Sequence, residues 1–278
     1  MQGAEAAIDE IVVTSKRQSE AVADHIGNIA KLGEEAVRES QHVHSHELFV
    51  RVPGVWITRA SGQESLPSIR SPVLTGPGSC GAFLILENGI PTRPNGFCNV
   101  NQLFELPTEL AASIEVIRGP GNALYGSNAL HGTINVLLPG ADTLPQAAAE
   151  FGPNDFLRLS GQFGTAGGTS AGIVYADDGG FRDDSGYRQA KGYASHTLDT
   201  ESGSLTFSRA ASDLDQETAG FILGFDAYKD PVLRTQNLNP EAFRRASSQR
   251  LTAHWQRSGR RFDLDVRPFL RHSDMEFL

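Results

Sequence analysis

Several features are scarce in this 278-residue chain, and each scarcity restricts what the protein can be. Lysine and arginine total 24 against 33 acidic residues, and a formal net charge of −9 opposes binding to nucleic acid, which needs a basic face. No apolar run approaches the roughly 18 to 20 residues of a transmembrane helix, so a helical membrane protein is excluded. A membrane β-barrel is not excluded, because its strands alternate and keep the mean hydropathy modest.

The N-terminus lacks a secretory signal, since residues 1–7 contain neither a basic region nor an apolar core. Either the protein is cytosolic or its signal lies outside this segment. The two cysteines, Cys80 and Cys98, are 98 − 80 = 18 positions apart and have no metal-binding spacing. The spacing leaves two states open, namely free thiols or a disulfide that closes a short loop and contributes roughly 3 kcal/mol.

The composition is that of a folded chain, with 39% hydrophobic residues, 29 glycines and 15 phenylalanines. Residues 1–20 read as a polar, linker-like segment with one β-prone patch. Residues 21–140 mix helical and strand patterns and predict a small α/β domain. The elements expected there are a partly helical stretch 19–32, a helix at 34–40, a hairpin over 82–92 that turns at Asn88-Gly89, a helix start at 107–110 capped by Thr108, and strands at 113–118 and 133–138.

Residues 146–278 alternate apolar and polar side chains, as in 157–163, 171–175 and 251–255, and this pattern predicts strands with one apolar and one wet face. A soluble sandwich and a membrane barrel both fit such alternation. Short turns at residues 152–155, 164–168, 200–202 and 258–260, together with long polar loops at 177–192 and 211–249, favour an outer-membrane barrel. We expect about six or seven strands.

A family resemblance emerges from a series of ordered motifs. Residues 114–136, which include Arg118-Gly119-Pro120-Gly121 and Tyr125-Gly126, resemble the signature of the plug domain of TonB-dependent outer-membrane receptors. Residues 48–55, 67–71 and 84–91 resemble three further plug motifs, although Ser71 replaces a glycine and Glu87-Asn88 departs mildly from the third motif. The N-terminal patch resembles the TonB box, and its residues are Asp9, Glu10, Ile11, Val12, Val13 and Thr14.

The resemblance implies an α+β plug domain followed by antiparallel transmembrane strands of an incomplete barrel. It divides the chain into an N-terminal periplasmic segment (1–20), a plug (21–140) and the N-terminal part of the barrel (146–278). The implied activity is energy-coupled uptake of a scarce nutrient, such as a ferric siderophore or a cobalamin-like chelate, across the outer membrane of a Gram-negative bacterium. The implied partners are the TonB energy transducer with its inner-membrane complex, outer-membrane lipid and a small-molecule metal chelate.

Residue roles follow from the same resemblance. Arg70 and Arg118 are expected to pair with wall carboxylates, for which Glu150, Asp263 and Asp265 are the candidates. Cys80 and Cys98 become a disulfide that clamps an apical loop. The TonB box is expected to add to a strand of the transducer. The candidate ligand loops contain Gly78, Ser79, Arg93, Asn95 and Phe97.

The length conflicts with a complete receptor. A barrel of 22 strands needs more than roughly 350 residues, whereas 278 − 146 + 1 = 133 are available. We therefore expect the chain to be an N-terminal fragment.

Other readings are weaker. His42, His44 and His46 alternate and make a metal site conceivable, but a solvated polar segment explains them better, so we expect no metal and no cofactor. No catalytic constellation is present, and the GxGxxG-like letters at 76–81 open no helix, so an enzyme is not expected. The main alternative function is a secreted β-rich binding or adhesion module. A signalling receptor is disfavoured by the short segment before the TonB box.

Overall fold

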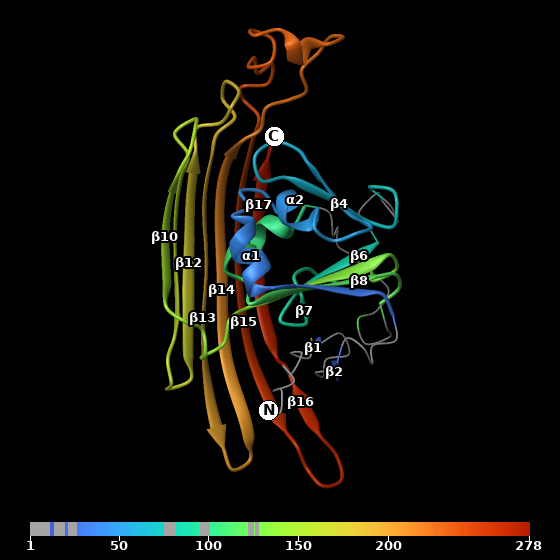
Figure 1. Cartoon of the computed structure of the whole chain (residues 1–278), viewed down its shortest axis with the longest axis vertical. Coiled ribbons are helices and arrows are strands. Elements are labelled where there is room, and N and C mark those ends of the chain that lie inside the picture. The colour runs from blue at the N-terminus through green and yellow to red at the C-terminus, as the bar shows by residue number, and fades with distance from the viewer. Residues whose placement is uncertain are drawn as a thin grey trace, which may run out of the picture.

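The computed structural model describes residues 12–13, 20–21, 27–74, 82–94, 101–121, 125 and 128–278. Residues 27–140 form a compact unit of helices and short strands, which we call the inner domain. Residues 146–278 form a tall, curved antiparallel sheet, which we call the wall. The inner domain lies against the concave face of the wall (Figure 1). Within the described residues, every helix is too short or too polar to cross a membrane.

A five-stranded mixed sheet organises the inner domain, in the order β3-β8-β9-β6-β7. β6 and β9 are parallel, and the other neighbouring pairs are antiparallel. A separate hairpin of β4 and β5 projects toward the loops of the wall, and β1 pairs with β2. The strands and helices are β1 (Val12–Val13), β2 (Glu20–Ala21), β3 (Ile29–Gly33), α1 (Glu34–Ser40), α2 (Ser45–Phe49), β4 (Val55–Arg59), β5 (Ser65–Ile69), β6 (Phe83–Glu87), β7 (Ile90–Pro91), the 3-10 helices η3 (Leu103–Glu105) and η4 (Thr108–Leu110), β8 (Ser113–Arg118) and β9 (Gly132–Leu137).

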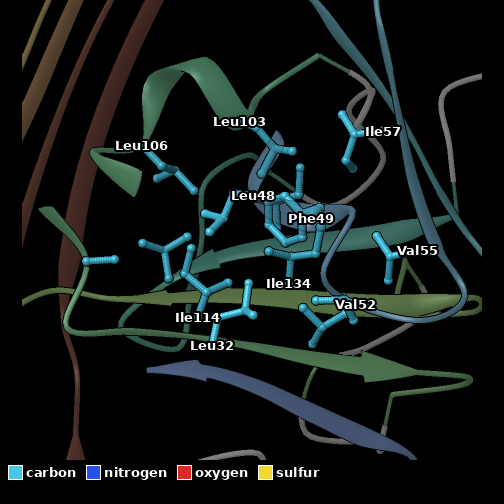
Figure 2. Packing of buried hydrophobic residues seen from close by; sticks show 14 of the residues in the cluster. Leu32, Leu48, Phe49, Val52, Val55, Ile57, Leu103, Leu106, Ile114 and Ile134 are labelled. Atoms are coloured by element: carbon cyan, nitrogen blue, oxygen red, sulfur yellow. The ribbon is translucent and has the colours of Figure 1, made fainter. Parts of the chain in front are cut away.

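The core of the inner domain lies between this sheet and the α1–α2 segment (Figure 2). Phe49 from α2, Ile85 from β6 and Ile134 from β9 are fully buried. All five residues of β6 are buried, because this strand is covered on both faces. Each large apolar side chain in such a core contributes about 1.5 to 3 kcal/mol through removal from water.

Strand direction decides which residues of the inner domain meet the wall. β8 starts near the wall, where the preceding Leu110 packs with Val174 and Tyr193, and it ends at Arg118. Six residues at about 3.3 Å per residue carry Arg118 roughly 17 Å from that start. β6 runs the opposite way, so Glu87 at its end meets the wall.

The wall contains the strands β10 (Gln146–Phe151), β11 (Leu157–Gly164), β12 (Thr169–Asp178), β13 (Tyr187–Thr200), β14 (Gly203–Glu217), β15 (Phe243–Arg257), β16 (Leu264–Val266) and β17 (Phe269–Phe277). Each of them pairs antiparallel with its neighbours. The 3-10 helix η5 (Ala227–Lys229) lies in the long loop after β14.

The strands β16 and β17 occupy one strand position of the wall, which is interrupted once. We call each such position of the wall a stave. Both pair with β15, and the register of this pairing is the same before and after the interruption. Trp255 lies opposite Val266, and Thr252 lies opposite Phe269. The interruption falls at Arg267-Pro268, because proline has no N–H to donate to the ladder. In the described part of the chain the wall therefore has seven staves, and the predicted fold class and strand number are confirmed.

Alternation gives the wall two chemically different faces. Inward side chains contact the inner domain and are mostly polar or small, as with Gln189, Ser212 and Ser248. The outward face carries a band of exposed apolar side chains, namely Leu159, Phe163, Ile173, Leu198, Phe207, Leu251 and Leu270. This two-faced pattern is typical of a sheet that meets apolar surroundings on one side only.

Several local predictions are confirmed. The helix at 34–40, the strand at 113–118 and the hairpin turning at Asn88-Gly89 form as expected. Asn88 and Gly89 both have positive φ, as this kind of tight hairpin turn requires.

Other local predictions were wrong. The helical pattern over 19–32 is contradicted by β2 and β3. Thr108 does not cap η4, since its hydroxyl bonds to His42 Nε2 at 3.0 Å instead.

The two long loops are also shorter than expected. Strands occupy both ends of 177–192 and of 211–249, which leaves the connections 179–186 and 218–242. The turn at 152–155 lies at the same end of the wall as these long connections, because β10 and β11 are antiparallel to each other. The other three short turns lie at the opposite end.

Candidate functional site

The candidate site begins with ion pairs that join the inner domain to the wall. In each of the three closest pairs the inner domain supplies the carboxylate and the wall supplies the cation. Lys191 Nζ lies 2.6 Å from Glu109 Oε1, and Arg244 Nη2 lies 2.6 Å from Glu64 Oε1. Arg250 binds Glu87 through two hydrogen bonds, Nε to Oε1 at 3.0 Å and Nη2 to Oε2 at 2.9 Å. These geometries are typical of strong, charge-assisted hydrogen bonds.

The β6–β7 hairpin is held by three arginines of neighbouring staves. Arg250 also donates to the Glu105 carbonyl at 3.0 Å. Arg267 Nη1 donates to the Asn88 carbonyl at 3.3 Å, and Arg271 Nη1 donates to the Pro91 carbonyl at 2.6 Å. The hairpin is therefore the part of the inner domain most firmly attached to β15 and to the β16–β17 stave.

The Glu109 carboxyl is buried deeply enough that its surroundings shift its pKa. Burial alone raises the pKa of Glu109, but the ammonium of Lys191 outweighs it, so the net pKa of this carboxyl lies below its usual range. Glu109 is consequently ionised at neutral pH.

The tip of the β4–β5 hairpin closes the other end of the interface. Ser61 Oγ donates to the Ala219 carbonyl at 2.7 Å, and the Gln63 amide donates to Gln216 Oε1 at 2.7 Å. A cavity of about 650 Å³ lies between this tip and the long connections of the wall. Its lining includes Arg59, Phe181, Tyr187 and Phe221. The size suits a small molecule, and the lining offers both aromatic and cationic contacts.

Arg70 and Arg118 do not pair with the wall, and that prediction was wrong. Arg118 donates to the Pro53 carbonyl at 2.7 Å and to the Ile29 carbonyl at 3.5 Å, both within the inner domain. The reason is the direction of β8, which carries Arg118 away from the described staves. Partial burial, followed by the nearby charge of Arg70, lowers the pKa of Arg118.

The expected carboxylate partners are engaged within the wall itself. Glu150 pairs with Arg158 at 2.5 Å, and Asp265 pairs with Arg267 at 2.7 Å. Asp263 accepts a hydrogen bond from the Gly259 amide at 3.3 Å.

The turn after Arg118 explains the glycines of the signature. Gly119 has φ +127, which side-chain-bearing residues rarely adopt, and Gly121 packs so closely that an added Cβ would lie 2.5 Å from the Ala129 Cβ. Pro120 lies between them and is exposed. Tyr125 is buried in a small cluster with Leu84 and Leu86. Gly126 lies outside the described residues.

The structure describes only part of the predicted TonB box and ligand loops. Val12 and Val13 form β1, which pairs with Glu20–Ala21. Arg93 forms an ion pair with Glu105 inside the inner domain. Its role as a ligand residue stays a prediction. The remaining predicted residues lie outside the described residues, and they are Asp9, Glu10, Ile11, Thr14, Gly78, Ser79, Cys80, Asn95, Phe97 and Cys98.

The histidines of 42–46 do not converge on a metal. His42 bonds to Thr108 through Nε2 and to Ser40 through Nδ1, and His44 bonds to the Glu64 carbonyl at 2.9 Å. No group of metal-binding side chains occurs among the residues that the structure describes. Burial lowers the pKa of His42 and of His44 to about 4, so both rings are neutral at pH 7.

Sequence reasoning missed the wall cations and the hairpin tip at residues 60–64. The cations were hidden because the segments around Lys191, Arg244 and Arg250 read as polar loops. The sequence nonetheless contained a pattern that could have predicted the inward position of Lys191. Gln189, Lys191 and Tyr193 lie at alternate positions and so share one face of a strand.

Comparison with known proteins relates the inner domain to a known family of domains. A family model described as the TonB-dependent receptor plug domain matches residues 21–133. The vitamin B12 transporter BtuB of Vibrio vulnificus (strain CMCP6) is 27% identical over 173 residues, which are 62% of this chain and 28% of that protein. The chain therefore spans just over a quarter of the length of this curated relative.

Solved structures share the fold at low identity. The siderophore receptor PiuA from Acinetobacter baumannii superposes with a TM-score of 0.72 at 13% identity, over 97% of this chain and 39% of that one. The ferric yersiniabactin uptake receptor FyuA from Yersinia pestis gives 0.69 at 17% identity, over 90% and 41%. Residues 21–133 thus match the plug domain of TonB-dependent receptors, and the chain as a whole has the fold of a fragment of such a receptor, with the inner domain in the place of the plug and the wall in the place of barrel staves.

Proposed function

We propose that this chain acts in energy-coupled uptake of a scarce metal chelate, such as a ferric siderophore or a cobalamin-like compound, across the outer membrane of a Gram-negative bacterium. The observation that carries the proposal is an independently cored inner domain, held against the concave face of a strand wall by ion pairs. These ion pairs lie outside the apolar core of the inner domain, so the inner domain can separate from the wall without loss of that core.

The substrate of this proposal enters from the end of the wall that carries the long connections. The cavity of about 650 Å³ at the β4–β5 tip is the entry site, with Arg59 and the aromatic side chains as its contacts. The predicted TonB box at residues 9–14 binds the energy transducer by strand addition. The reaction is transport, and no covalent bond of the substrate changes.

Crosslinking tests the transducer partnership. A Val12→Cys variant should form a disulfide with cysteines introduced along the strand edge of the periplasmic domain of a TonB-type transducer. A cysteine at Thr143, in the exposed connection between the inner domain and the wall, is the matched control and should not react. Absence of a Val12-specific product would remove the TonB-box assignment and, with it, the energy coupling.

A secreted binding module is the alternative. The outward apolar band weighs against it, because side chains such as Ile173 and Phe207 would face water in a soluble protein. A chain that remains monodisperse without detergent would favour the alternative, whereas a strict detergent requirement favours the membrane protein.

A further inference from the structure

The inward face of the wall carries a line of cations that starts near the end with the long connections and follows the strands toward the other end. Register places Arg244 in one cross-strand row, Lys191 two rows further along, and Arg250 with Arg271 in the next row. At about 6.6 Å for each two-residue step, this line covers roughly 20 Å of the wall height. Arg267 continues it by two more rows.

Arg250 and Arg271 are direct cross-strand partners on the same face. Like charges in this arrangement repel each other and destabilise a sheet unless anions lie nearby. Here the anions belong to the inner domain, because Glu87 binds Arg250 and the Glu105 carboxylate lies 4.0 Å from it. The wall therefore holds a cationic row whose neutralising groups are carried by a separate, attached body.

The other inward cations of the wall are also neutralised by carboxylates of the inner domain. Glu64 covers Arg244, and Glu109 covers Lys191. The inward carboxylates of the wall lie elsewhere or are engaged: Glu150 pairs with Arg158, Asp265 pairs with Arg267, and Asp178 accepts a hydrogen bond from Gly180. The side chains between the cations are uncharged: Gln189, Ser212 and Ser248 are polar, whereas Tyr187, Leu214 and Ala246 belong to a small apolar cluster.

We propose that Lys191, Arg244, Arg250 and Arg271 form an anion-binding lane, and that the plug carboxylates occupy it until an anionic substrate takes their place. The inference rests on the proposed transport function, and it names the substrate class as a chelate that carries carboxylate or comparable anionic groups. When the inner domain shifts, each cation that loses a glutamate accepts an anion of the substrate. A series of such sites, each of moderate strength, allows an anion to bind and leave in steps.

Citrate binding to the whole chain in detergent micelles tests the lane without any transducer. The readout is the increase in the midpoint of thermal unfolding as metal-free citrate is titrated at constant ionic strength, since a ligand of the folded state stabilises it. Glu87→Gln uncovers Arg250 and should bind citrate at least tenfold more tightly than the unchanged chain. Glu64→Gln, which uncovers Arg244 near the long connections, is the second variant should the first fail to fold.

The matched control is Asp215→Asn. This substitution makes the same change in net charge but uncovers Arg245 on the outward face, where the pair is exposed. It should not improve citrate binding, and Arg250→Gln added to Glu87→Gln should abolish the gain. Sorbitol, a neutral polyol of similar size, should not bind to any variant.

Three outcomes would overturn the lane: no gain in both glutamate variants, an equal gain in Asp215→Asn, or a gain that survives Arg250→Gln. The crosslinking result is independent of these arms. A Val12-specific crosslink with failed citrate arms removes the lane and leaves the transport proposal intact, and the reverse combination removes only energy coupling.

Discussion

The inner domain and the wall are stabilised by different kinds of contact. The inner domain has a continuous apolar core, with Phe49, Ile85 and Ile134 fully buried. The wall has no comparable core within the described residues, and much of its inward burial comes from polar side chains such as Gln189, Lys191 and Arg250 pressed against the inner domain. The difference teaches that one body keeps its shape through packing, whereas the contact between the bodies combines buried ion pairs with two small apolar clusters.

Deletion of a core side chain should give the largest effect. Phe49→Ala leaves a cavity at the centre of the inner domain and should lower the free energy of unfolding by about 3 to 5 kcal/mol. Phe207→Ala, on the exposed outward face of the wall, should cost less than about 1 kcal/mol. Urea unfolding in micelles compares the two. Equal losses would show that the inner domain is not the independently packed body described above.

Loss of one cation from the interface should come next. Arg250→Met leaves Glu87 buried without its partner, and we expect a loss of about 3 kcal/mol. Arg245→Met removes one partner of an exposed wall pair and should cost under about 1 kcal/mol. Because both variants remove one arginine from β15, the comparison isolates burial. A small effect at Arg250 would contradict the claim that buried ion pairs stabilise the contact between the bodies.

Acidification should weaken the inner domain through its buried histidines. The pKa of His42 is about 4 in the folded state and 6.5 as its ordinary value, so the unfolded chain takes up a proton that the folded chain excludes. The stability is complete above about pH 6.5 and falls as the pH drops toward 4, with a loss of about 2 kcal/mol between pH 7 and pH 5.

His42→Asn should remove this part of the pH dependence. Unfolding measured at pH 7 and at pH 5 checks it, with His272→Asn on the exposed outward face as the control. An unchanged pH profile in His42→Asn would mean that the pKa of His42 is the same in the folded and the unfolded chain.

The sequence predicted the inner domain better than the upper part of the wall. The β6–β7 hairpin and β8 could be predicted because their signals are local, an Asn-Gly turn and a β-branched run. β3 was missed because Ile29 and Leu32 have helical spacing by chance, and pairing with β8 overrides a weak local pattern.

The loop ends of β13 to β15 could not be predicted, because polar side chains on both faces conceal a strand. Gln216 and Arg250 are buried only because the inner domain covers them. The sequence around each residue does not indicate this burial. The roles of the wall cations depend on contacts with residues more than 80 positions away, such as Lys191 with Glu109. Local patterns carry no information on such pairings.

The opposed arginines of β15 and β17 have a consequence for how the protein assembles. Two strands that bring Arg250 and Arg271 face to face repel each other at that row before any glutamate is present. We therefore expect stable closure of this seam to follow the docking of the β6–β7 hairpin with Glu87. The inner domain would then also act as a template on which the outer sheet is completed.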